Sequence, residues 1–267
     1  MIEMEEIQSV VREAAKFFTD RAAVGMIREK GLYDYVTAVD EVVQQYMQEK
    51  LEALYPDIQF MGEEKDNSTI DMRGDIWVLD PVDGTTNLVH DYRNSAISLA
   101  LISNREVIFG IIYNPFSDEM YYAKKGNGSF LNGEKIHVSD AKAMEESLIS
   151  IGTSPYFKDE AQKNFQIFSQ IFRDCQDIRR CGSASLDLAH VACGRIDGYV
   201  ENHLKLWDYA AGVLIVREAG GKVLNYEGQE LPMELDGNVV AGNSLIPKII
   251  VEQYLDETRG KYDRSFI

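Results

Sequence analysis

The sequence has few cysteines and no arrangement of sulfur or imidazole groups that suits a soft metal. Its 267 residues include three cysteines, which form no Cys-x-x-Cys pair (Cys175, Cys181 and Cys193). An odd number of scattered thiols argues against a disulfide framework and favours reduced, structural cysteines. The four histidines show no His-Glu-x-x-His or other zinc-ligand spacing, which disfavours a zinc enzyme.

Long apolar runs are also missing. No stretch approaches the roughly 20 apolar residues that a membrane span needs. The first six residues are acidic where a signal peptide would be basic, and no apolar segment of the secretory type follows them. We therefore expect a cytoplasmic protein that makes no contact with a membrane.

Positive charge is scarce. The chain has 27 Lys and Arg residues against 44 Asp and Glu residues, a formal net charge of −17. Such a charge repels nucleic-acid backbones and anionic membrane surfaces, so a nucleic-acid partner is not expected. Solubility alone explains most of this charge. An acidic protein that handles an anionic substrate would still need local positive charge, and bound cations can supply it.

The composition is otherwise that of a globular protein, with 45% apolar and 10% aromatic residues. Apolar residues at helical spacing predict helices over 5–24, 38–55, 160–172, 185–193, 207–219 and 246–255. Apolar runs predict strands over 76–79, 96–102, 107–113, 147–151, 196–200 and 239–241. Asn132-Gly133 between two short apolar runs predicts a hairpin. Helices and strands are mixed throughout, which predicts a layered α and β architecture with an amino-terminal half over 1–145 and a carboxy-terminal half over 146–267.

Two aspartates follow the apolar run 76–79. Asp80 comes first, Pro81 is expected to turn the chain, and Asp83 follows three positions after Asp80. Side chains at such a turn can converge on one point. Magnesium is typically held by a few carboxylates together with water and substrate phosphate, and the carbonyl of Val82 can add a further ligand.

The same segment continues into a possible phosphate site. Gly84 allows the backbone to approach a ligand closely, and Thr85 can open a helix whose free N–H groups face a phosphate. An ordinary Asp-Gly turn with a threonine cap is the competing interpretation.

Two further acidic residues have ordinary explanations when taken singly. Glu63, in Gly62-Glu63-Glu64, has the setting of a surface charge. Asp208, in Trp207-Asp208-Tyr209, has the setting of a helix cap.

Together these segments resemble the signature set of the inositol monophosphatase family. The segments 62–64, 80–87 and 207–212 occur in the order and at the separations typical of that family, and 35–40 and 126–133 resemble two further family segments. The resemblance spans nearly the whole chain. It implies a layered α-β-α-β-α sandwich of the inositol monophosphatase and sugar phosphatase type, assembled as a homodimer.

The resemblance also implies roles for individual residues. Glu63, Asp80 and the carbonyl of Val82 would hold a first magnesium ion, and Asp80, Asp83 and Asp208 a second. Some members bind a third ion that again involves Glu63, and manganese is a possible substitute. Four converging carboxylates repel one another, so cations or protons are needed to make such a cluster tolerable.

The resemblance also covers residues that would contact the attacking water, the phosphate group and the substrate alcohol. Thr85, backed by Asp40, would activate the nucleophilic water, and the N–H groups of Gly84 and Thr85 would bind phosphate oxygens. The residues matching family contacts to substrate hydroxyls are Gly182, Ser183, Ala184 and Glu201, joined by Asp83 and Asp208. A small-residue helix start needed only for packing is an equal interpretation of 182–184.

The resemblance implies a lithium-sensitive phosphomonoesterase that acts on a small polyol or sugar phosphate. Inositol monophosphate is the preferred candidate substrate. We expect direct attack by a metal-activated water, because no Cys-x5-Arg or Asp-x-Asp-x-Thr/Val signature offers a covalent nucleophile. Fructose-1,6-bisphosphatase, adenosine 3′,5′-bisphosphate nucleotidase, histidinol-phosphate phosphatase and NADP phosphatase remain alternatives, because their pockets lie in loops outside the motifs. A regulatory binding protein is the non-enzymatic alternative, since some family members bind transcription machinery.

Overall fold

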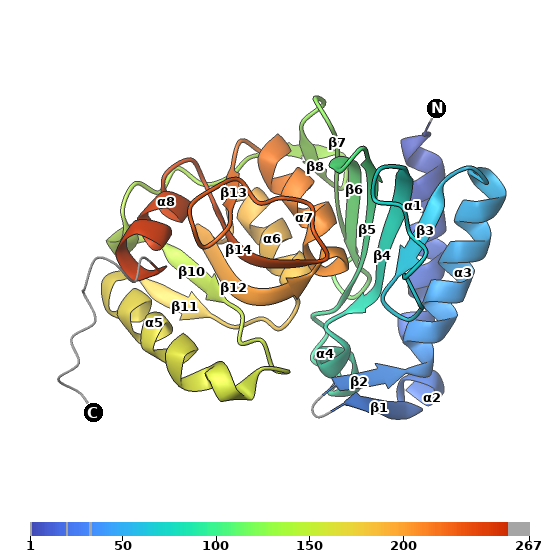
Figure 1. Ribbon diagram of the computed structural model, residues 1–267, viewed down its shortest axis with the longest axis horizontal. Coiled ribbons are helices and arrows are strands. Elements are labelled where there is room, and N and C mark those ends of the chain that lie inside the picture. Colours follow the sequence, from blue (N-terminus) through green and yellow to red (C-terminus); the bar gives the residue numbers. More distant parts are fainter. Residues whose placement is uncertain (1, 20, 32–33, 256–267) are drawn as a thin grey trace.

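Two β-sheets and three layers of helix alternate across the molecule. A computed structural model describes residues 2–19, 21–31 and 34–255. Figure 1 shows the order of the layers, which is outer helices, a seven-stranded sheet, two central helices, a five-stranded sheet and a second set of outer helices. The predicted α-β-α-β-α sandwich is therefore confirmed.

The first helical layer contains α1 (Met4–Ala14) and α3 (Ala38–Leu54). The predicted helix over 5–24 is interrupted, because a 3₁₀ turn (Ala15–Thr19) and a short helix, α2 (Arg21–Val24), follow α1. The helix predicted over 38–55 is confirmed. It begins with a capping box, in which the Thr37 hydroxyl accepts a hydrogen bond from the Val39 N–H and the Asp40 carboxylate accepts one from the Thr37 N–H.

The first sheet packs against these helices. Its strands, in spatial order, are β3 (Gln59–Gly62), β4 (Asp75–Asp83), β5 (Ala96–Ser103), β6 (Glu106–Asn114), β7 (Glu119–Lys124), β8 (Ser129–Leu131) and β9 (Glu134–Ile136). Only the β3–β4 pair among these is parallel. The hairpin predicted at Asn132-Gly133 joins β8 to β9. A separate hairpin is formed by β1 (Ile27–Gly31) and β2 (Asp34–Thr37).

Strand β4 corrects one prediction, because Pro81 does not end the strand. The register against β5 shifts here, so that Asp80 pairs with Ser98 and Asp83 pairs with Ala96. Three steps along β4 thus match two along β5, which is a β-bulge and a usual place for a proline in a sheet. Residues three apart in a regular strand point to opposite faces. The bulge brings Asp80 and Asp83 to the same face.

The carboxy-terminal half supplies the other layers. The five-stranded sheet has the order β11 (Asp177–Arg179), β10 (Leu148–Ile151), β12 (Gly198–Lys205), β14 (Asp236–Gly242) and β13 (Lys222–Leu224). The strand predicted over 196–200 begins later and runs five residues further, so Glu201 lies inside β12. The outer helices are α5 (Ala161–Asp174) and α8 (Ile246–Ile250), the latter continued by a π-helical turn (Val251–Leu255).

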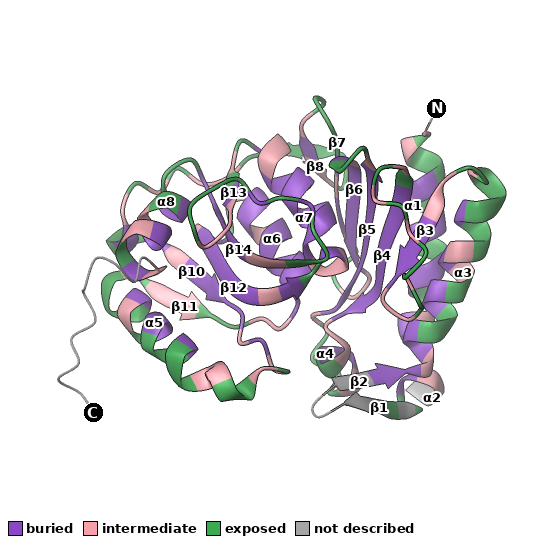
Figure 2. Ribbon diagram, in the orientation of Figure 1, coloured by how far each residue is buried: buried purple, intermediate pink, exposed green. Residues whose placement is uncertain are grey.

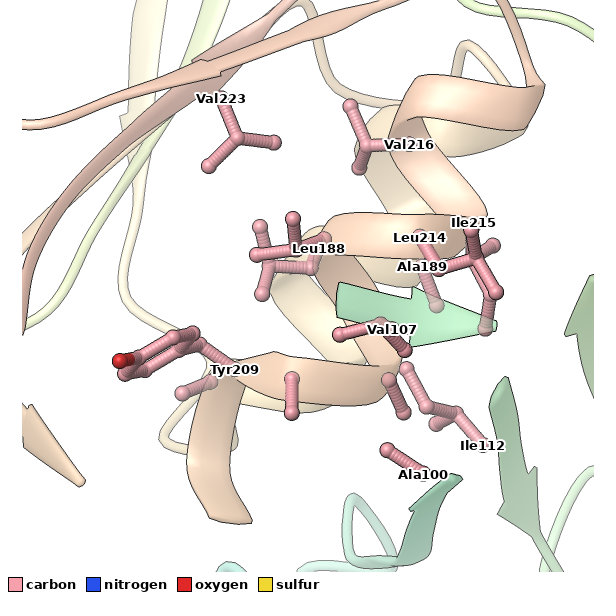
Figure 3. Close-up of a cluster of buried hydrophobic side chains, with 14 of the residues drawn as sticks. Ala100, Val107, Ile112, Leu188, Ala189, Tyr209, Leu214, Ile215, Val216 and Val223 are labelled. Carbon is pink, nitrogen blue, oxygen red and sulfur yellow. The ribbon is translucent and has the colours of Figure 1, made fainter. Parts of the chain in front are cut away.

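The central helices, α6 (Ala184–Ala192) and α7 (Leu206–Glu218), are buried on nearly every side (Figure 2). A helix between two sheets has no solvent face, which explains why both sequences are apolar on most sides. Figure 3 shows how side chains of both helices meet those of the two sheets, including Ala100, Val107, Ile112, Leu188, Ala189, Leu214, Ile215 and Val223. No helix in the described part of the chain is long and apolar enough to cross a membrane.

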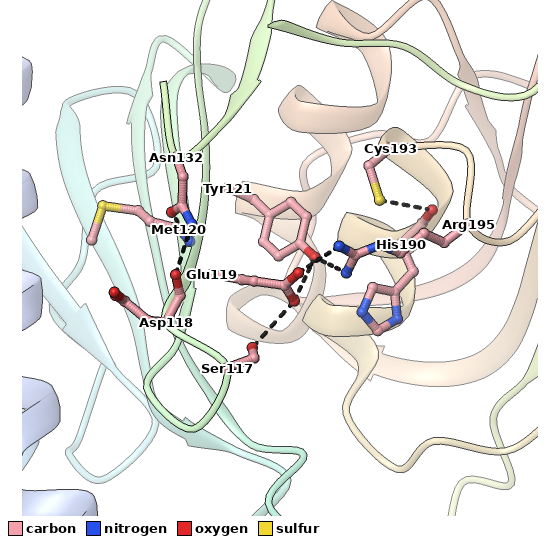
Figure 4. Close-up of polar contacts among 9 residues, drawn as sticks. All are labelled: Ser117, Asp118, Glu119, Met120, Tyr121, Asn132, His190, Cys193 and Arg195. Atoms are coloured by element: carbon pink, nitrogen blue, oxygen red, sulfur yellow. Dashed lines mark hydrogen bonds and ion pairs between the residues drawn. The ribbon is translucent and has the colours of Figure 1, made fainter. Parts of the chain in front are cut away.

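A set of polar contacts links strand β7 to the segment that follows α6 at one edge of this core (Figure 4). Arg195, which follows α6, donates one hydrogen bond to the Tyr121 hydroxyl at 2.8 Å and another to a Glu119 carboxylate oxygen at 2.5 Å. Tyr121 and Glu119 both belong to β7. The neighbouring guanidinium holds the pKa of Glu119 below its usual range, so the ion pair persists at neutral pH.

The approach of α7 to the first sheet depends on a glycine. A Cβ atom at Gly110 of β6 would lie 2.9 Å from the Ala211 carbonyl oxygen and 3.1 Å from its Cα. We therefore expect Gly110→Ala to lower the free energy of unfolding by about 1–3 kcal/mol through overpacking, measured by urea denaturation. Gly237→Ala is the matched control, because its nearest neighbour is a Tyr209 ring carbon at 3.2 Å that can shift. Equal losses in the two variants would contradict a tight contact between sheet and helix.

Candidate metal centre

Acidic side chains from three parts of the fold meet between the two sheets. Asp80 and Asp83 come from the bulged end of β4, and both are buried. Glu63 follows β3 directly, and its N–H donates a hydrogen bond to the Leu79 carbonyl at 3.2 Å, which fixes it beside β4. Asp208 lies in the first turn of α7, where its carboxylate accepts a hydrogen bond from the Lys205 N–H at 2.7 Å.

The electrostatics show that these groups lie close to one another. Burial raises the pKa of Asp80 well above its usual value, and the negative charges of Glu63, Asp83, Asp208 and Asp40 raise it further. Burial raises the pKa of Asp208 in the same way, followed by the charges of Asp83 and Glu63. Such a cluster is stable only if protons or cations compensate its charge.

The donor set fits a hard cation. It consists of carboxylate oxygens and the Val82 carbonyl, with no thiolate or imidazole, and magnesium and manganese prefer oxygen ligands of this kind. Among residues 2–19, 21–31 and 34–255, no three acidic, His or Cys side chains already form a coordination shell. Donors of the chain hold these carboxylates in place, as the Val82 N–H holds Asp80 at 2.9 Å.

Asp83 is anchored to the start of α6. It accepts hydrogen bonds from the Ser183 hydroxyl at 2.5 Å, from the Ser185 N–H at 2.7 Å and from the Ala184 N–H at 3.3 Å. The Ser185 hydroxyl donates to the same carboxylate. The predicted substrate residues Ser183 and Ala184 therefore lie directly beside a predicted metal ligand. Ser185 was missed because no local pattern distinguishes it from a serine that only begins a helix.

Thr85 lies between two acceptors at the start of α4 (Thr85–Val89). Its Oγ1 is 3.1 Å from Asp40 Oδ1 and 3.1 Å from the Val82 carbonyl oxygen. The other carboxylate oxygen of Asp40 accepts hydrogen bonds from the Thr37 N–H at 2.8 Å and the Thr37 hydroxyl at 2.6 Å, so Asp40 cannot rotate freely. Burial raises the pKa of Asp40.

Gly84 joins the metal segment to the substrate segment. Its φ of +91° is in the left-handed region, and a Cβ atom there would lie 3.0 Å from the Asn94 carbonyl oxygen and 3.1 Å from that of Gly182. The Asn87 amide spans the same gap, donating to Asn94 O at 2.7 Å and to Cys181 O at 2.9 Å. The first N–H groups of α4 have no partner within the helix. Their use in binding phosphate stays a prediction.

Glu201 is fixed by a second set of contacts. Its two carboxylate oxygens accept hydrogen bonds from the Ser154 N–H at 3.0 Å and from the Tyr199 hydroxyl at 2.5 Å. Gly152 is required beside it, because a Cβ atom there would lie 1.8 Å from the Glu201 carboxyl carbon. Burial raises the pKa of Glu201, and the charge of the neighbouring Asp83 raises it further. Its supporting residues lie 2 to 49 positions away along the chain, and sequence reasoning did not find them.

Asp187 is a buried acid that sequence reasoning also missed. It lies on α6 and accepts a hydrogen bond from the Ser150 hydroxyl at 2.7 Å. Burial raises the pKa of Asp187 to about 8, and the charges of Glu201 and Asp83 act in the same direction. This carboxyl group is therefore largely protonated at neutral pH.

Comparisons with known proteins place the chain in a family. A sequence profile of the inositol monophosphatase family matches residues 3–260. The inositol-1-monophosphatase of Rhizobium meliloti (strain 1021) is 39% identical over 223 residues, which are 84% of each protein. The Nus factor SuhB of Escherichia coli (strain K12) is 36% identical over 229 residues, or 86% of this chain and 85% of that protein.

Solved structures agree with these sequence matches. An inositol monophosphatase (IMPase) of Thermotoga maritima superimposes with a TM-score of 0.83 at 32% identity, covering 96% of this chain and 98% of the other. The extragenic suppressor protein suhB of Bartonella henselae gives a TM-score of 0.87 at 32% identity, covering 95% and 98%.

Asp187 generates a prediction about stability and pH. Its folded pKa of about 8 exceeds the ordinary aspartate value of 3.8, so the folded state binds the proton more tightly. Stability should therefore fall as pH rises from about 4 to about 8, by at most roughly 1.4 kcal/mol per pH unit. Asp187→Asn should make this decline shallower by the part that Asp187 contributes, measured by urea unfolding of metal-free protein at several pH values. Part of the decline should remain, because burial also raises the pKa values of the neighbouring acids Asp80, Asp208 and Glu201.

The control for this experiment is Asp177→Asn. Asp177 is half exposed, and its pKa lies below the usual value because Arg179 donates a hydrogen bond to it. Its removal should leave the pH dependence between 5 and 8 unchanged. Parallel curves for wild type and Asp187→Asn over this range would show that Asp187 ionises normally.

Proposed function

This chain belongs to the inositol monophosphatase family, and from that membership we propose that it is a magnesium-dependent phosphomonoesterase of small polyol or sugar phosphates, with inositol monophosphate as the first candidate. One observation carries the proposal, namely that Glu63, Asp80, Asp83 and Asp208 converge closely enough to raise the pKa values of Asp80 and Asp208. A phosphatase can use such a cluster to hold cations against an anionic substrate.

The proposed metal site uses the oxygen ligands described above. Glu63, Asp80 and the Val82 carbonyl would hold one ion, and Asp80, Asp83 and Asp208 a second, with a third possible at Glu63. When bound, these ions polarise the phosphoryl oxygens and lower the pKa of a bound water. Manganese suits the same ligands.

Thr85 and Asp40 are proposed to move the proton of the attacking water. The Thr85 hydroxyl can accept that proton while it gives its own to Asp40 Oδ1, 3.1 Å away. Burial favours the protonated form of Asp40, which makes this carboxylate a stronger base than an exposed one. The two hydrogen bonds from Thr37 keep the accepting oxygen aimed at Thr85.

The phosphate and the alcohol are proposed to bind on opposite sides of the metal site. The N–H groups of Gly84 and Thr85 would hold phosphate oxygens as the charge on them increases. Glu201 would accept hydrogen bonds from substrate hydroxyls, with Gly182, Ser183, Ala184, Asp83 and Asp208 as further contacts. Each oxygen of Glu201 uses one acceptor position for its protein donor, and a second remains for the substrate.

A regulatory function is a second candidate, because relatives of similar identity carry the name Nus factor SuhB. A net charge of −17 disfavours direct contact with nucleic acid, so a protein partner would be needed. The two functions separate in a variant that lacks metal binding, which would lose phosphatase activity and keep a purely structural interaction. A homodimeric, cytoplasmic enzyme remains our expectation.

A substrate panel tests the proposed reaction. Inositol 1-phosphate, fructose 1,6-bisphosphate, adenosine 3′,5′-bisphosphate, histidinol phosphate and NADP should be incubated with magnesium and phosphate release measured. We expect release that a chelator abolishes, that added magnesium restores and that lithium inhibits. Activity at least about ten times higher on a non-inositol substrate would overturn inositol as the leaving alcohol. Absence of release from every ester would overturn the enzymatic proposal.

Asp208→Asn tests the metal ligands with two independent measurements. We expect kcat to fall by more than about a hundredfold, because altering even the partners of metal ligands costs 10–100-fold. Without metal the variant should melt at a higher temperature than wild type, since one of several repelling carboxylates is gone. The stabilisation caused by added magnesium should shrink. Asp177→Asn is the control, and near-normal turnover of Asp208→Asn would exclude Asp208 from the metal site.

A further inference from the structure

The guanidinium group of Arg180 lies at the edge of the proposed substrate site and forms no ion pair with a described acidic side chain. Its Nε and Nη2 atoms donate hydrogen bonds to Thr153 Oγ1 at 3.2 and 3.0 Å. Across residues 2–19, 21–31 and 34–255, no acidic side chain forms an ion pair with it. A neutral hydroxyl therefore orients this cation and leaves its charge available.

Two observations place Arg180 at the alcohol side of the site. A Cβ atom at Gly182 would lie 2.3 Å from Arg180 Nη1, so the guanidinium lies against the Gly182 backbone. The positive charge of Arg180 also lowers the pKa of Glu201, as expected for groups that lie near each other. Gly182 and Glu201 are both proposed contacts to the substrate alcohol.

Glu201 forms no ion pair with Arg180. Each of its carboxylate oxygens accepts one hydrogen bond from a protein group, from the Ser154 N–H and from the Tyr199 hydroxyl. Thr153 and Ser154 are neighbours in the chain, so the same short segment orients Arg180 and Glu201. The result is a cation and a hydrogen-bond acceptor fixed side by side.

Several other arginines of the described chain pair with acidic side chains, although Arg217 donates only to the Leu231 carbonyl. Arg179, the preceding residue, donates to Asp177 at 2.5 Å, and Arg195 donates to Glu119 at 2.5 Å. In a chain of net charge −17, an arginine at the site that lacks such a partner is suited to an anion from outside. The planar guanidinium binds phosphate and carboxylate with paired hydrogen bonds.

We propose that Arg180, oriented by Thr153, forms a subsite for a second anionic group on the substrate. The substrate class is then a small polyol or sugar phosphate whose alcohol carries another phosphate or a carboxylate. One ester would be cleaved at the proposed metal site, and Arg180 would hold the anionic group that stays on the leaving alcohol. This inference rests on the proposed phosphatase function and specifies its substrate.

Matched substrate pairs test the subsite. The pairs are inositol 1,4-bisphosphate with inositol 1-phosphate, and fructose 1,6-bisphosphate with fructose 1-phosphate. For each pair, the ratio of kcat/KM with and without the second phosphate is measured. Arg180→Gln should lower this ratio roughly ten- to a hundredfold, the effect of losing charge-assisted hydrogen bonds. Arg180→Lys should recover part of it, because the charge remains and the paired geometry does not.

Arg179→Gln is the matched control, because it removes an adjacent arginine that is already paired with Asp177. It should leave the ratio at the wild-type value. An unchanged ratio in Arg180→Gln, or an equal fall in Arg179→Gln and Arg180→Gln, would overturn the subsite.

A binding measurement separates this inference from the proposed activity. Calorimetric titration of the two inositol phosphates, with calcium in place of magnesium and phosphate release monitored, gives a ratio of Kd values that needs no turnover. Arg180→Gln should reduce the preference for the bisphosphate by a similar factor. If the wild type hydrolyses no ester, the proposed function fails, and the subsite is still supported or overturned by this ratio.

Discussion

Burial of several carboxylates within reach of one another is the constraint on which the rest of this structure depends. Each one alone would stay in water, and together they repel. The fold compensates with donors that are fixed by secondary structure. Asp83 receives hydrogen bonds from the start of α6, Asp208 from the start of α7, and Asp40 from the capping box of α3. The positive end of a helix dipole favours a negative charge at each of these positions. The site is therefore destabilising in itself and is tolerated because the large apolar clusters of the fold supply the stability that it lacks.

The two sheets and the central helices determine where the carboxylates meet. Helices α6 and α7 are packed between the sheets, so their first turns are fixed relative to the end of β4. The bulge at Pro81 then decides which face of β4 carries Asp80 and Asp83. Without the extra residue the two side chains would point to opposite faces, and Asp83 could not reach Ser183 and Ser185. A local irregularity in one strand thus joins the two halves of the chain at the site.

The sequence predicts those features that depend on neighbouring residues. The helix over 38–54 and the hairpin at Asn132-Gly133 follow from apolar spacing and turn chemistry, and the acidic candidates follow from a resemblance over several short segments. Strand β1 and the three-residue strands β11 and β13 were missed because they contain few apolar residues or are too short to show a period. The path through Pro81 was predicted wrongly, because pairing with β5 decides it and a proline is compatible with either outcome. Ser185 and Asp83 are 102 positions apart, so their contact exists only in the folded chain.

The fold constrains the residues proposed to bind metal more strongly than the residues proposed to recognise the substrate. The proposed metal ligands lie at the ends of buried strands and helices, and moving any of them would disturb a core. Arg180 is exposed and is held by one hydroxyl, so its replacement costs little packing. Gly182 contacts both the buried metal segment and the exposed Arg180. Its φ of +83° directs the chain into α6, where Ser183 and Ala184 bind Asp83, and its missing side chain leaves the space that Arg180 occupies. A larger residue at 182 would disturb both the metal segment and the neighbouring cation, whereas a change at 180 alters only what the site accepts beside the phosphate.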